Sequence, residues 1–257
     1  MFDPRVALAS LSGSSDSAWA RAAESVAGAA FLGGIAVCEQ TRHAARQMKL
    51  RDRSEFIPPD PLAFIDTQLS ALRASEIRGG VNVRSVDVSA TRRVAQLCAT
   101  HDAIYEVNAH CRQEEMCAVG AGETLLQEPS VLIEHVRAAA DTGADVSVKV
   151  RAEIPGVDLP AIAQSIEEAG GAAIHVDAMD TRTIVRDIVD AAGLFVIGNN
   201  GIRTRNDVAE FVSYGADAVS VGRASDRPAV LNEVHRAMET LDPAESDVHP
   251  PSKCNDR

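Results

Sequence analysis

The stretch from Ile104 to Gly122 carries the residue types best suited to chemistry. A short apolar run leads directly into Asn108, His110 and Cys111, and a loop that contains Cys117 follows. Polar and nucleophilic side chains just past the carboxyl end of a buried strand are where α/β proteins place their active sites. The stretch therefore predicts a reaction centre, and the rest of the chain must supply its surroundings.

Cys111 is the candidate proton donor of this centre. A cysteine thiol is ordinarily protonated at neutral pH, so it can deliver a proton to a carbanion. Two alternatives stay open, an inert buried thiol and a metal site shared with His110 and Cys117. The metal site is disfavoured because no second Cys/His pair has ligand spacing, so we expect no metal.

Strand patterns alternate with helix patterns along the chain. Continuous small apolar runs such as VSVKV, AAIHV and DAVSV are typical of parallel strands buried on both faces. The predicted strands are 5–10, 29–32, 80–83, 103–107, 145–150, 172–176, 194–197 and 217–221. The predicted helices are 16–27, 89–100, 129–142, 159–169, 181–191, 204–214 and 228–241, and a further helix ends near residue 77.

Eight strand–helix units in about 240 residues predict an α/β fold, a single (β/α)8 TIM barrel. We expect the barrel to span 1–241, with a long insertion between strands 2 and 3 over 33–79. Residues 242–257 carry a Pro pair and acidic residues, which predicts a disordered tail. A doubly wound open sheet is disfavoured because no Gly-x-Gly-x-x-Gly follows the first strand.

The carboxyl ends of barrel strands converge on one mouth, so the residues at those ends form the candidate site. They are Ala9, Ser10, Asn82, Asn108, Cys111, Lys149, Arg151, His175, Asp177, Asn199, Asn200, Gly201, Gly222 and Arg223. Polar residues that recur at the ends of apolar strands are more informative than any single motif.

Lys149 lies within an apolar strand, and His175 lies on the next one. A fixed cation at Lys149 can stabilise negative charge on a reduced cofactor ring or an enolate, although pairing with Glu153 is the structural alternative. In isolation His175 is more typical of a hydrogen-bonded core histidine. Its position beside Lys149 favours a ligand-facing role.

The last two loops, GNNGI and VGRAS, match the phosphate site that barrels build after strands seven and eight. Glycine lets backbone N–H groups approach a phosphate closely, and Arg223 can add a bidentate contact. The two loops together predict a phosphate-bearing ligand.

The formal net charge is -12, and three lysines stand against 22 arginines. Either a high-salt cell or an ordinary acidic enzyme explains this balance, and neither favours general nucleic-acid binding. The dense basic run Arg42–Arg53 is the exception: it is either a solvated helix face or a patch that meets an anionic substrate.

No apolar run is long enough to span a membrane and no signal peptide is apparent, so we expect a cytoplasmic protein with reduced thiols.

The run VNAHC…GAGETLLQEP, followed by VSVKVR, IHVD, VIGNNGI and VGRA, resembles the tRNA-dihydrouridine synthases and their relatives. The likeness is clearest over 103–225, and LASLSGSSD takes the place of the family's first flavin loop, which brings in Ala9 and Ser10. The resemblance implies an FMN-dependent barrel that reduces uracil rings in tRNA, with NAD(P)H as reductant.

The resemblance also implies roles for individual residues. Asn82 and Lys149 would contact the flavin ring, Cys111 would protonate the uracil carbon, and Asn108 would orient ring and substrate. The ring or phosphate end of FMN would be bound by His175, Asn199, Asn200, Gly201, Gly222 and Arg223.

Two motifs depart from the family pattern. The usual Asn-x-Gly-Cys-Pro reads Asn108-Ala109-His110-Cys111-Arg112, and the usual Asn-Gly-Asp-Ile reads Asn199-Asn200-Gly201-Ile202. The chain also stops soon after the barrel, where the family carries a helical RNA-binding domain, and this favours a small-molecule substrate. The basic run Arg42–Arg53 favours tRNA and is its expected contact.

Other functions stay open at this point. One is a flavoenzyme similar to dihydroorotate dehydrogenases that acts on a small pyrimidine-like metabolite. Others are a non-redox barrel for a phosphorylated metabolite and a catalytically silent scaffold. The sequence leaves the oligomeric state open.

Overall fold

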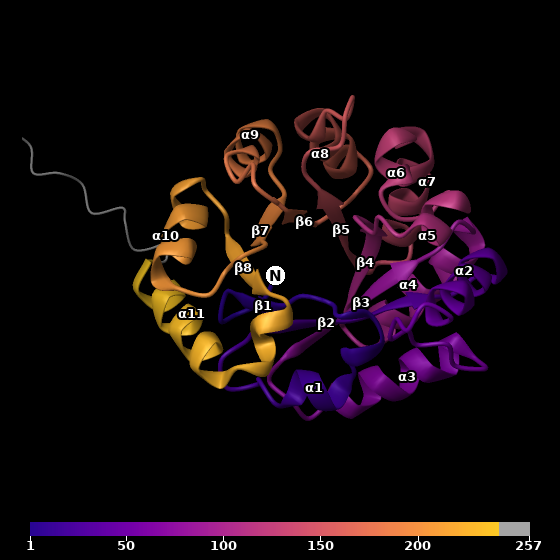
Figure 1. The fold of residues 1–257 in the computed structure, drawn as a ribbon, viewed down its shortest axis with the longest axis horizontal. Coiled ribbons are helices and arrows are strands. Elements are labelled where there is room, and N and C mark those ends of the chain that lie inside the picture. The colour runs from indigo at the N-terminus through magenta and orange to yellow at the C-terminus, as the bar shows by residue number, and fades with distance from the viewer. Residues whose placement is uncertain (242–257) are drawn as a thin grey trace, which may run out of the picture.

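Eight parallel strands form a closed barrel in the computed structural model, which describes residues 1–241 (Figure 1). Each strand pairs with the next along the chain, and β8 pairs with β1 to close the ring. The strands are β1 Val6–Leu8, β2 Ala29–Ala36, β3 Arg78–Arg84, β4 Ile104–Ala109, β5 Asp145–Arg151, β6 Ala173–Asp177, β7 Phe195–Asn199 and β8 Ala218–Val221. The predicted (β/α)8 barrel is confirmed, and the predicted tail, 242–257, lies outside the described residues.

Helices surround the barrel on its outside (Figure 1). They are α1 Ser17–Arg21, α2 Glu39–Lys49, α3 Pro61–Leu72, α4 Val88–Thr100, α5 Glu114–Ala118, α6 Thr124–Gln127, α7 Pro129–Ala140, α8 Leu159–Glu168, α9 Ile184–Ala191, α10 Arg205–Ser213 and α11 Pro228–Leu241, with 3-10 turns η1 Ser12–Ser14 and η2 Arg223–Asp226. Aspartates cap α1, α3, α4 and α8 by accepting backbone N–H groups in the first turn. None of the helices among residues 1–241 is both long and apolar enough to cross a membrane.

Strand β2 is longer than its sequence predicts. Gly33 and Gly34 suggest the end of a strand, yet the segment continues to Ala36 and is buried throughout. It can do so because β3 pairs with it along its whole length, with a register shift between Gly33 and Ile35. The insertion therefore begins at Val37 and consists of α2, α3 and the loop between them.

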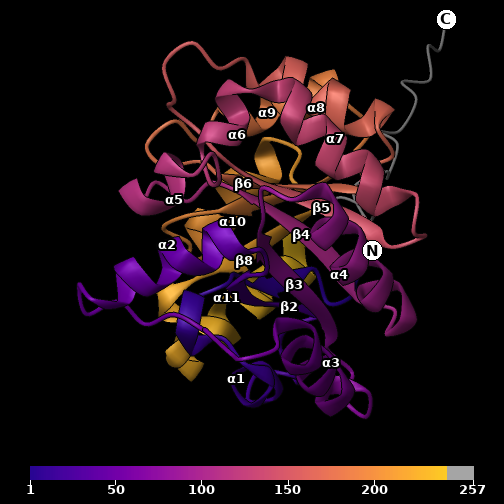
Figure 2. The same ribbon diagram turned by 90° about the vertical axis from the view of Figure 1, so that its right-hand side faces the viewer.

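Three further boundaries differ from the prediction. The predicted helix 16–27 is helical only over α1, and turns follow it. Strand β4 runs to Ala109, so Asn108 lies within the strand rather than after it. The short helices α5 and α6, which the sequence did not predict, follow β4 and carry the chain from Cys111 to α7. In Figure 2, α2, α5 and α6 lie on the side of the barrel opposite the N-terminus.

The barrel interior is layered. Toward the amino ends of the strands, an apolar cluster of Ala7, Ala29, Phe31, Ile104, Ile197 and Ala218 fills the barrel. Gly80 makes room for this layer, because a Cβ there would lie 2.7 Å from the Phe31 ring. The Phe31 ring lies against His175 with 5.2 Å between centroids, and a polar layer begins at His175.

Candidate active site

Glu106 is the centre of the polar layer. It is fully buried, and its carboxylate accepts hydrogen bonds from Asn82 Nδ2 at 2.7 Å and Ser147 Oγ at 3.3 Å. His175 Nδ1 lies 2.7 Å from Glu106 Oε2, and Ser220 Oγ lies 2.7 Å from His175 Nε2. Side chains of four strands are thus joined through one carboxylate.

Burial and neighbouring groups shift the pKa values of Glu106 and His175 in this layer. Burial alone would raise the pKa of Glu106, but His175, Lys149 and the Asn82 hydrogen bond hold that pKa below its usual value. Burial lowers the pKa of His175, with Lys149 adding to the effect. A neutral His175 that donates Nδ1–H to an ionised Glu106 and accepts from the Ser220 hydroxyl satisfies every contact.

The network continues toward the barrel mouth at both ends. Asn199 Nδ2 donates to Ser220 Oγ at 2.8 Å. On the other side, Asn108 Nδ2 donates to Asn82 Oδ1 at 2.7 Å, and Asn108 Oδ1 accepts the Cys111 backbone N–H at 3.1 Å. Three asparagine amides are therefore fixed in orientation by the buried layer beneath them.

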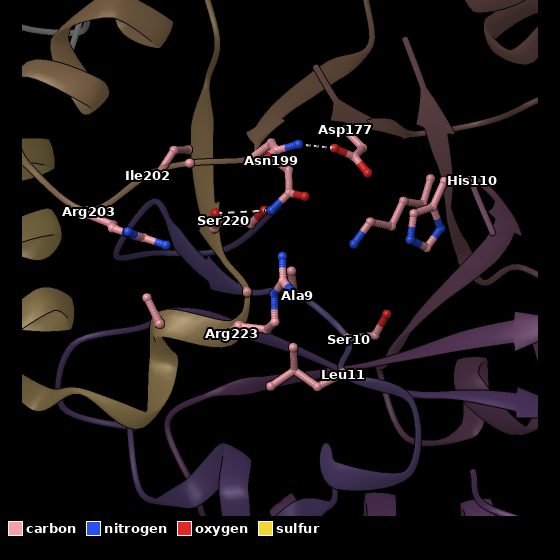
Figure 3. Close-up of a pocket in the computed structure, with 15 residues that line it drawn as sticks. Ala9, Ser10, Leu11, His110, Asp177, Asn199, Ile202, Arg203, Ser220 and Arg223 are labelled. Atoms are coloured by element: carbon pink, nitrogen blue, oxygen red, sulfur yellow. Dashed lines mark hydrogen bonds between the residues drawn. The ribbon is translucent and has the colours of Figure 1, made fainter. Parts of the chain in front are cut away.

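Above this layer the mouth opens into three adjoining cavities. The inner lobe has a volume of about 230 Å³ and the arginine lobe about 530 Å³, and a more open outer lobe of about 730 Å³ adjoins both. Ser10, His110 and Arg223 line all three lobes. The inner lobe is lined by Ala9, Ser10, Leu11, His110, Lys149, Asp177, Asn199, Asn200, Gly201, Ile202, Arg203, Ser220, Gly222, Arg223 and Ala224. Figure 3 shows Arg223 reaching into the inner lobe, with Asn199 and Asp177 on one side and His110 across from it.

Two arginines and a glycine give the inner lobe the chemistry of an anion site. Among residues 1–241, neither Arg203 nor Arg223 has an ion-pair partner, and a Cβ added at Gly222 would meet nothing within 4 Å. Backbone open to the cavity beside two unpaired guanidinium groups suits a phosphate. The fit to the phosphate end of FMN rests on this observation.

Lys149 supplies a cation deeper in the same lobe. The residue is 2% exposed, and within the described chain its ammonium group has no hydrogen-bond or ion-pair partner. Burial lowers the pKa of Lys149, while Glu106 and Asp177 oppose the shift. A buried cation held against a cavity suits the electron-accepting edge of a flavin ring.

His110 forms part of the wall shared by all three lobes. Burial lowers its pKa well below the ordinary value, and the nearby cations Lys149, Arg84 and Arg151 add to the shift. Within the described residues its Nδ1 atom is buried without a hydrogen-bond partner. Nε2 also has no hydrogen-bond partner among residues 1–241, so it is the ring nitrogen that can donate to or accept from a bound ligand.

Cys111 lies on the arginine lobe with Asn108. Its carbonyl accepts the Glu123 backbone N–H at 2.9 Å and lies against Gly122, where a Cβ would be 2.1 Å from the carbonyl oxygen. Gly122 has a φ of +68°, a conformation that side chains other than glycine rarely adopt. The thiol's position therefore depends on a glycine eleven residues further along the chain.

The structure brings most of the predicted site residues together. Ala9, Ser10, Lys149, Asn199, Asn200, Gly201, Gly222 and Arg223 line the inner lobe, and Asn108 and Cys111 line the arginine lobe. Asn82 and His175 lie one layer below. His175 is fully buried and hydrogen-bonded to Glu106 and Ser220, as a core histidine is, although its position beside Lys149 favoured a ligand-facing role. Contacts of these two residues with a flavin stay predictions.

Several site residues were missed. Arg84 and Arg112 line the arginine lobe, Arg203 and Ser220 line the inner lobe, and Glu106 organises the layer beneath. Glu106 could have been found, because it is an acidic residue at an inward-facing position of an apolar strand. Among residues 1–241 no three His, Cys, Asp or Glu side chains are grouped as a metal site would require.

The fold is a (β/α)8 barrel, and arginines line the cavities at its mouth. The sequence model of the dihydrouridine synthase family matches residues 80–256, so the chain belongs to the dihydrouridine synthase family. An uncharacterized protein of Methanocaldococcus jannaschii is 28% identical over 233 residues, which cover 86% of this chain and 89% of the relative.

A second relative is the catalytic subunit of dihydroorotate dehydrogenase B (NAD(+)) of Methanothermobacter thermautotrophicus. It is 27% identical over 172 residues, which cover 54% of this chain and 55% of the relative. Family and relative together support an oxidoreductase of the flavin-dependent type.

Among solved structures, morphinone reductase in complex with tetrahydroNAD superposes with a TM-score of 0.63 at 14% identity, covering 90% of this chain and 86% of the other. FabK (M276A mutant) from Thermotoga maritima superposes with a TM-score of 0.58 at 15% identity, covering 87% and 63%. At these identities the likeness concerns the fold alone.

Proposed function

We propose that this protein is an FMN-dependent reductase of uracil rings, with uridine in tRNA as its substrate. The observation that carries the proposal is the shared mouth: a thiol at Cys111 and a cation at Lys149 line adjoining lobes of one cavity. Membership of the dihydrouridine synthase family supports uridine as the substrate.

The chain's own residues divide the work between the two lobes. Gly222, Arg203 and Arg223 would hold the phosphate of FMN, and Lys149 would lie beside its ring. When bound, FMN supplies the hydride that reduces the ring double bond. NAD(P)H is the proposed source of that hydride.

Cys111 completes the reduction on the substrate side. Hydride addition to one carbon of the double bond leaves negative charge on the other carbon, and the Cys111 thiol delivers a proton there. Asn108 holds the backbone of Cys111 through its side-chain oxygen and so fixes the approach of the thiol. A proton from solvent then restores the thiol.

The basic run Arg42–Arg53 is the proposed contact with tRNA. His43, Arg46 and Lys49 are exposed on α2, whereas Arg51 is paired with Glu115 at 2.7 Å. Arg53 lines both the arginine lobe and the outer lobe, which extends this basic surface to the mouth. Phosphate contacts of this kind weaken as salt rises.

The first test is the cofactor and the proton donor. We expect the purified protein to release FMN on denaturation. Cys111→Ala should keep its FMN but lose uridine reduction by about a hundredfold or more, the usual contribution of a general acid. Cys98→Ala is the control, because Cys98 lies on α4 and lines none of the three lobes. Full activity in Cys111→Ala would show that Cys111 is not the proton donor.

The second test concerns the substrate. Deleting the gene in the source organism should lower the dihydrouridine content of its tRNA, measured by mass spectrometry of nucleosides. An unchanged content would refute tRNA as substrate and leave the second candidate, a free pyrimidine-like metabolite. That candidate is favoured by the dihydroorotate dehydrogenase relative and by the cationic arginine lobe.

A further inference from the structure

Arg84 is a buried cation directly beside the proposed reaction centre. The residue is 3% exposed and lines the arginine lobe with Asn108 and Cys111. Gly34 makes room for it, because a Cβ there would lie 2.8 Å from Arg84 Nε. A charge in this position is costly to bury, so its surroundings are informative.

Two segments from outside the barrel hold Arg84 in place. Its Nη1 donates to Glu55 Oε2 at 2.5 Å, from the loop between α2 and α3, and its Nη2 donates to Ser12 Oγ at 2.9 Å, from η1. The same loop is fixed to η1 by a backbone bond from Gly13 N to Ser54 O at 3.1 Å. The guanidinium group is therefore preorganised rather than free to move.

This pair is incompletely satisfied within the described part of the chain. Arg84 Nε and Glu55 Oε1 are both buried without a hydrogen-bond partner, and so is the Nε of Arg53, 3.7 Å from Glu55. A buried ion pair of this kind is weak as a source of stability, because desolvation offsets its attraction. Because Arg84 lines the same lobe as Asn108 and Cys111, the pair is better placed to bind a ligand than to stabilise the fold.

The lobe as a whole is cationic, although the chain has a net charge of -12. Arg53, Arg84, Arg112, Arg151 and Arg223 line it, against two carboxylates, Asp177 and Asp180. Asp177 already accepts from Asn200 at 2.8 Å, and Arg151 pairs with Glu123 only at 3.5 Å. Within residues 1–241, Arg112 has no ion-pair or hydrogen-bond partner.

We propose that the arginine lobe selects substrates whose reducible ring carries an anionic group, a phosphate or a carboxylate, bound by Arg84 and Arg112. Guanidinium groups match the geometry of both anions through paired N–H donors. Glu55 positions Arg84, and the anion takes the N–H donors of Nη1 and Nη2 that Glu55 and Ser12 leave free. This inference rests on the proposed ring reduction for the identity of the ring, but not for the anion.

The test compares matched neutral and anionic ligands. Uridine 5′-monophosphate is paired with uridine, and orotate with uracil, in calorimetric titrations of the protein as purified. We expect the anionic member of at least one pair to bind about tenfold or more tightly at low salt, as a charge-assisted hydrogen bond predicts. The pair that shows the preference identifies the anion as phosphate or carboxylate.

Variants then assign the preference to the lobe. Arg112→Gln changes an exposed side chain and should fold normally, and Arg84→Gln combined with Glu55→Gln removes both buried charges together. Both should reduce the preference to less than about threefold, since the charged contact is lost. Arg137→Gln, exposed on α7 and outside all three lobes, is the control and should keep it.

The inference is overturned if anionic and neutral ligands bind equally, or if both variants keep the full preference. Its failure differs from failure of the proposed function. If neutral uridine is reduced as fast as the nucleotide, the anion preference of the arginine lobe is refuted but the proposed reductase activity stands. A protein without FMN that still prefers the anion would refute the reductase and keep the lobe.

Discussion

Gly122 shows how closely the proposed thiol depends on backbone that lies outside the strand. Its positive φ and its contact with the Cys111 carbonyl are two separate constraints. Gly143 shares the first constraint, with a φ of +82°, but a Cβ there would meet nothing within 4 Å. The two glycines therefore separate conformational strain from steric contact.

We expect Gly143→Ala to cost about 1 kcal/mol of unfolding free energy, the lower range for a residue forced to positive φ. Gly122→Ala should cost more, about 3 kcal/mol, because the Cys111 carbonyl must also move. Urea unfolding measures both changes, and turnover should fall only in Gly122→Ala. Equal costs would show that the Cys111 carbonyl moves without a cost in stability, and unchanged turnover in Gly122→Ala would contradict the dependence of the thiol on Gly122.

Single residues also show what the sequence could predict. Lys149 and His175 are neighbours in register on β5 and β6, and alternation along a strand predicts that both point inward. Only Lys149 reaches the cavity, because its long side chain extends past the polar layer. The His175 ring stays at the depth of Glu106, and such depth cannot be predicted from alternation alone.

At the scale of elements, η2 carries the proposed phosphate contact. Gly222 precedes it, Arg223 begins it, and the turn leads into α11. Arg227, just after η2, offers a matched comparison: it is 63% exposed, lies 3.9 Å from Asp226 and lines none of the mouth lobes.

Arg223→Ala should therefore weaken FMN binding about tenfold, the effect of losing one charged hydrogen bond. The dissociation constant is measured from the change in flavin fluorescence as protein is added. Arg227→Ala should leave this constant unchanged. Equal dissociation constants for the wild type and Arg223→Ala would show that η2 does not bind the FMN phosphate.

Elements divide into those that local sequence determines and those that pairing determines. Apolar runs and aspartate caps predict the alternation of strands and helices, because periodicity and capping act over a few residues. The carboxyl half of β2 could not be predicted, since Gly33 and Gly34 disfavour a strand that only β3 completes. The Arg84–Glu55 pair joins β3 to a loop 29 residues earlier, which no local pattern indicates.

At the scale of the whole molecule, buried histidines couple stability to pH. Burial lowers the pKa of His110, His135 and His175. The unfolded chain takes up protons near pH 6.5, its ordinary histidine value, whereas the folded chain resists protonation until lower pH. The stability is therefore fully present above that value and is lost as the pH falls below it.

His135 isolates this effect from the mouth. It lies on α7, and its Nδ1 is 2.7 Å from Thr91 Oγ1 on α4. Between pH 7 and 5.5, His135→Gln should reduce the slope of unfolding free energy against pH by up to about 1.4 kcal/mol per pH unit. Urea unfolding at several pH values measures the slope. An unaltered slope in His135→Gln would contradict the coupling.

Trp19, the single tryptophan of the chain, joins the first and last parts of the barrel. Its indole N–H donates to Ser225 Oγ at 3.1 Å, and its ring lines the outer lobe beside Arg53 and Arg223. The emission of one indole therefore reports on one place, and a yellow chromophore bound nearby would absorb it. Quenching of Trp19 fluorescence would therefore report whether a flavin is bound in the mouth, without any added label.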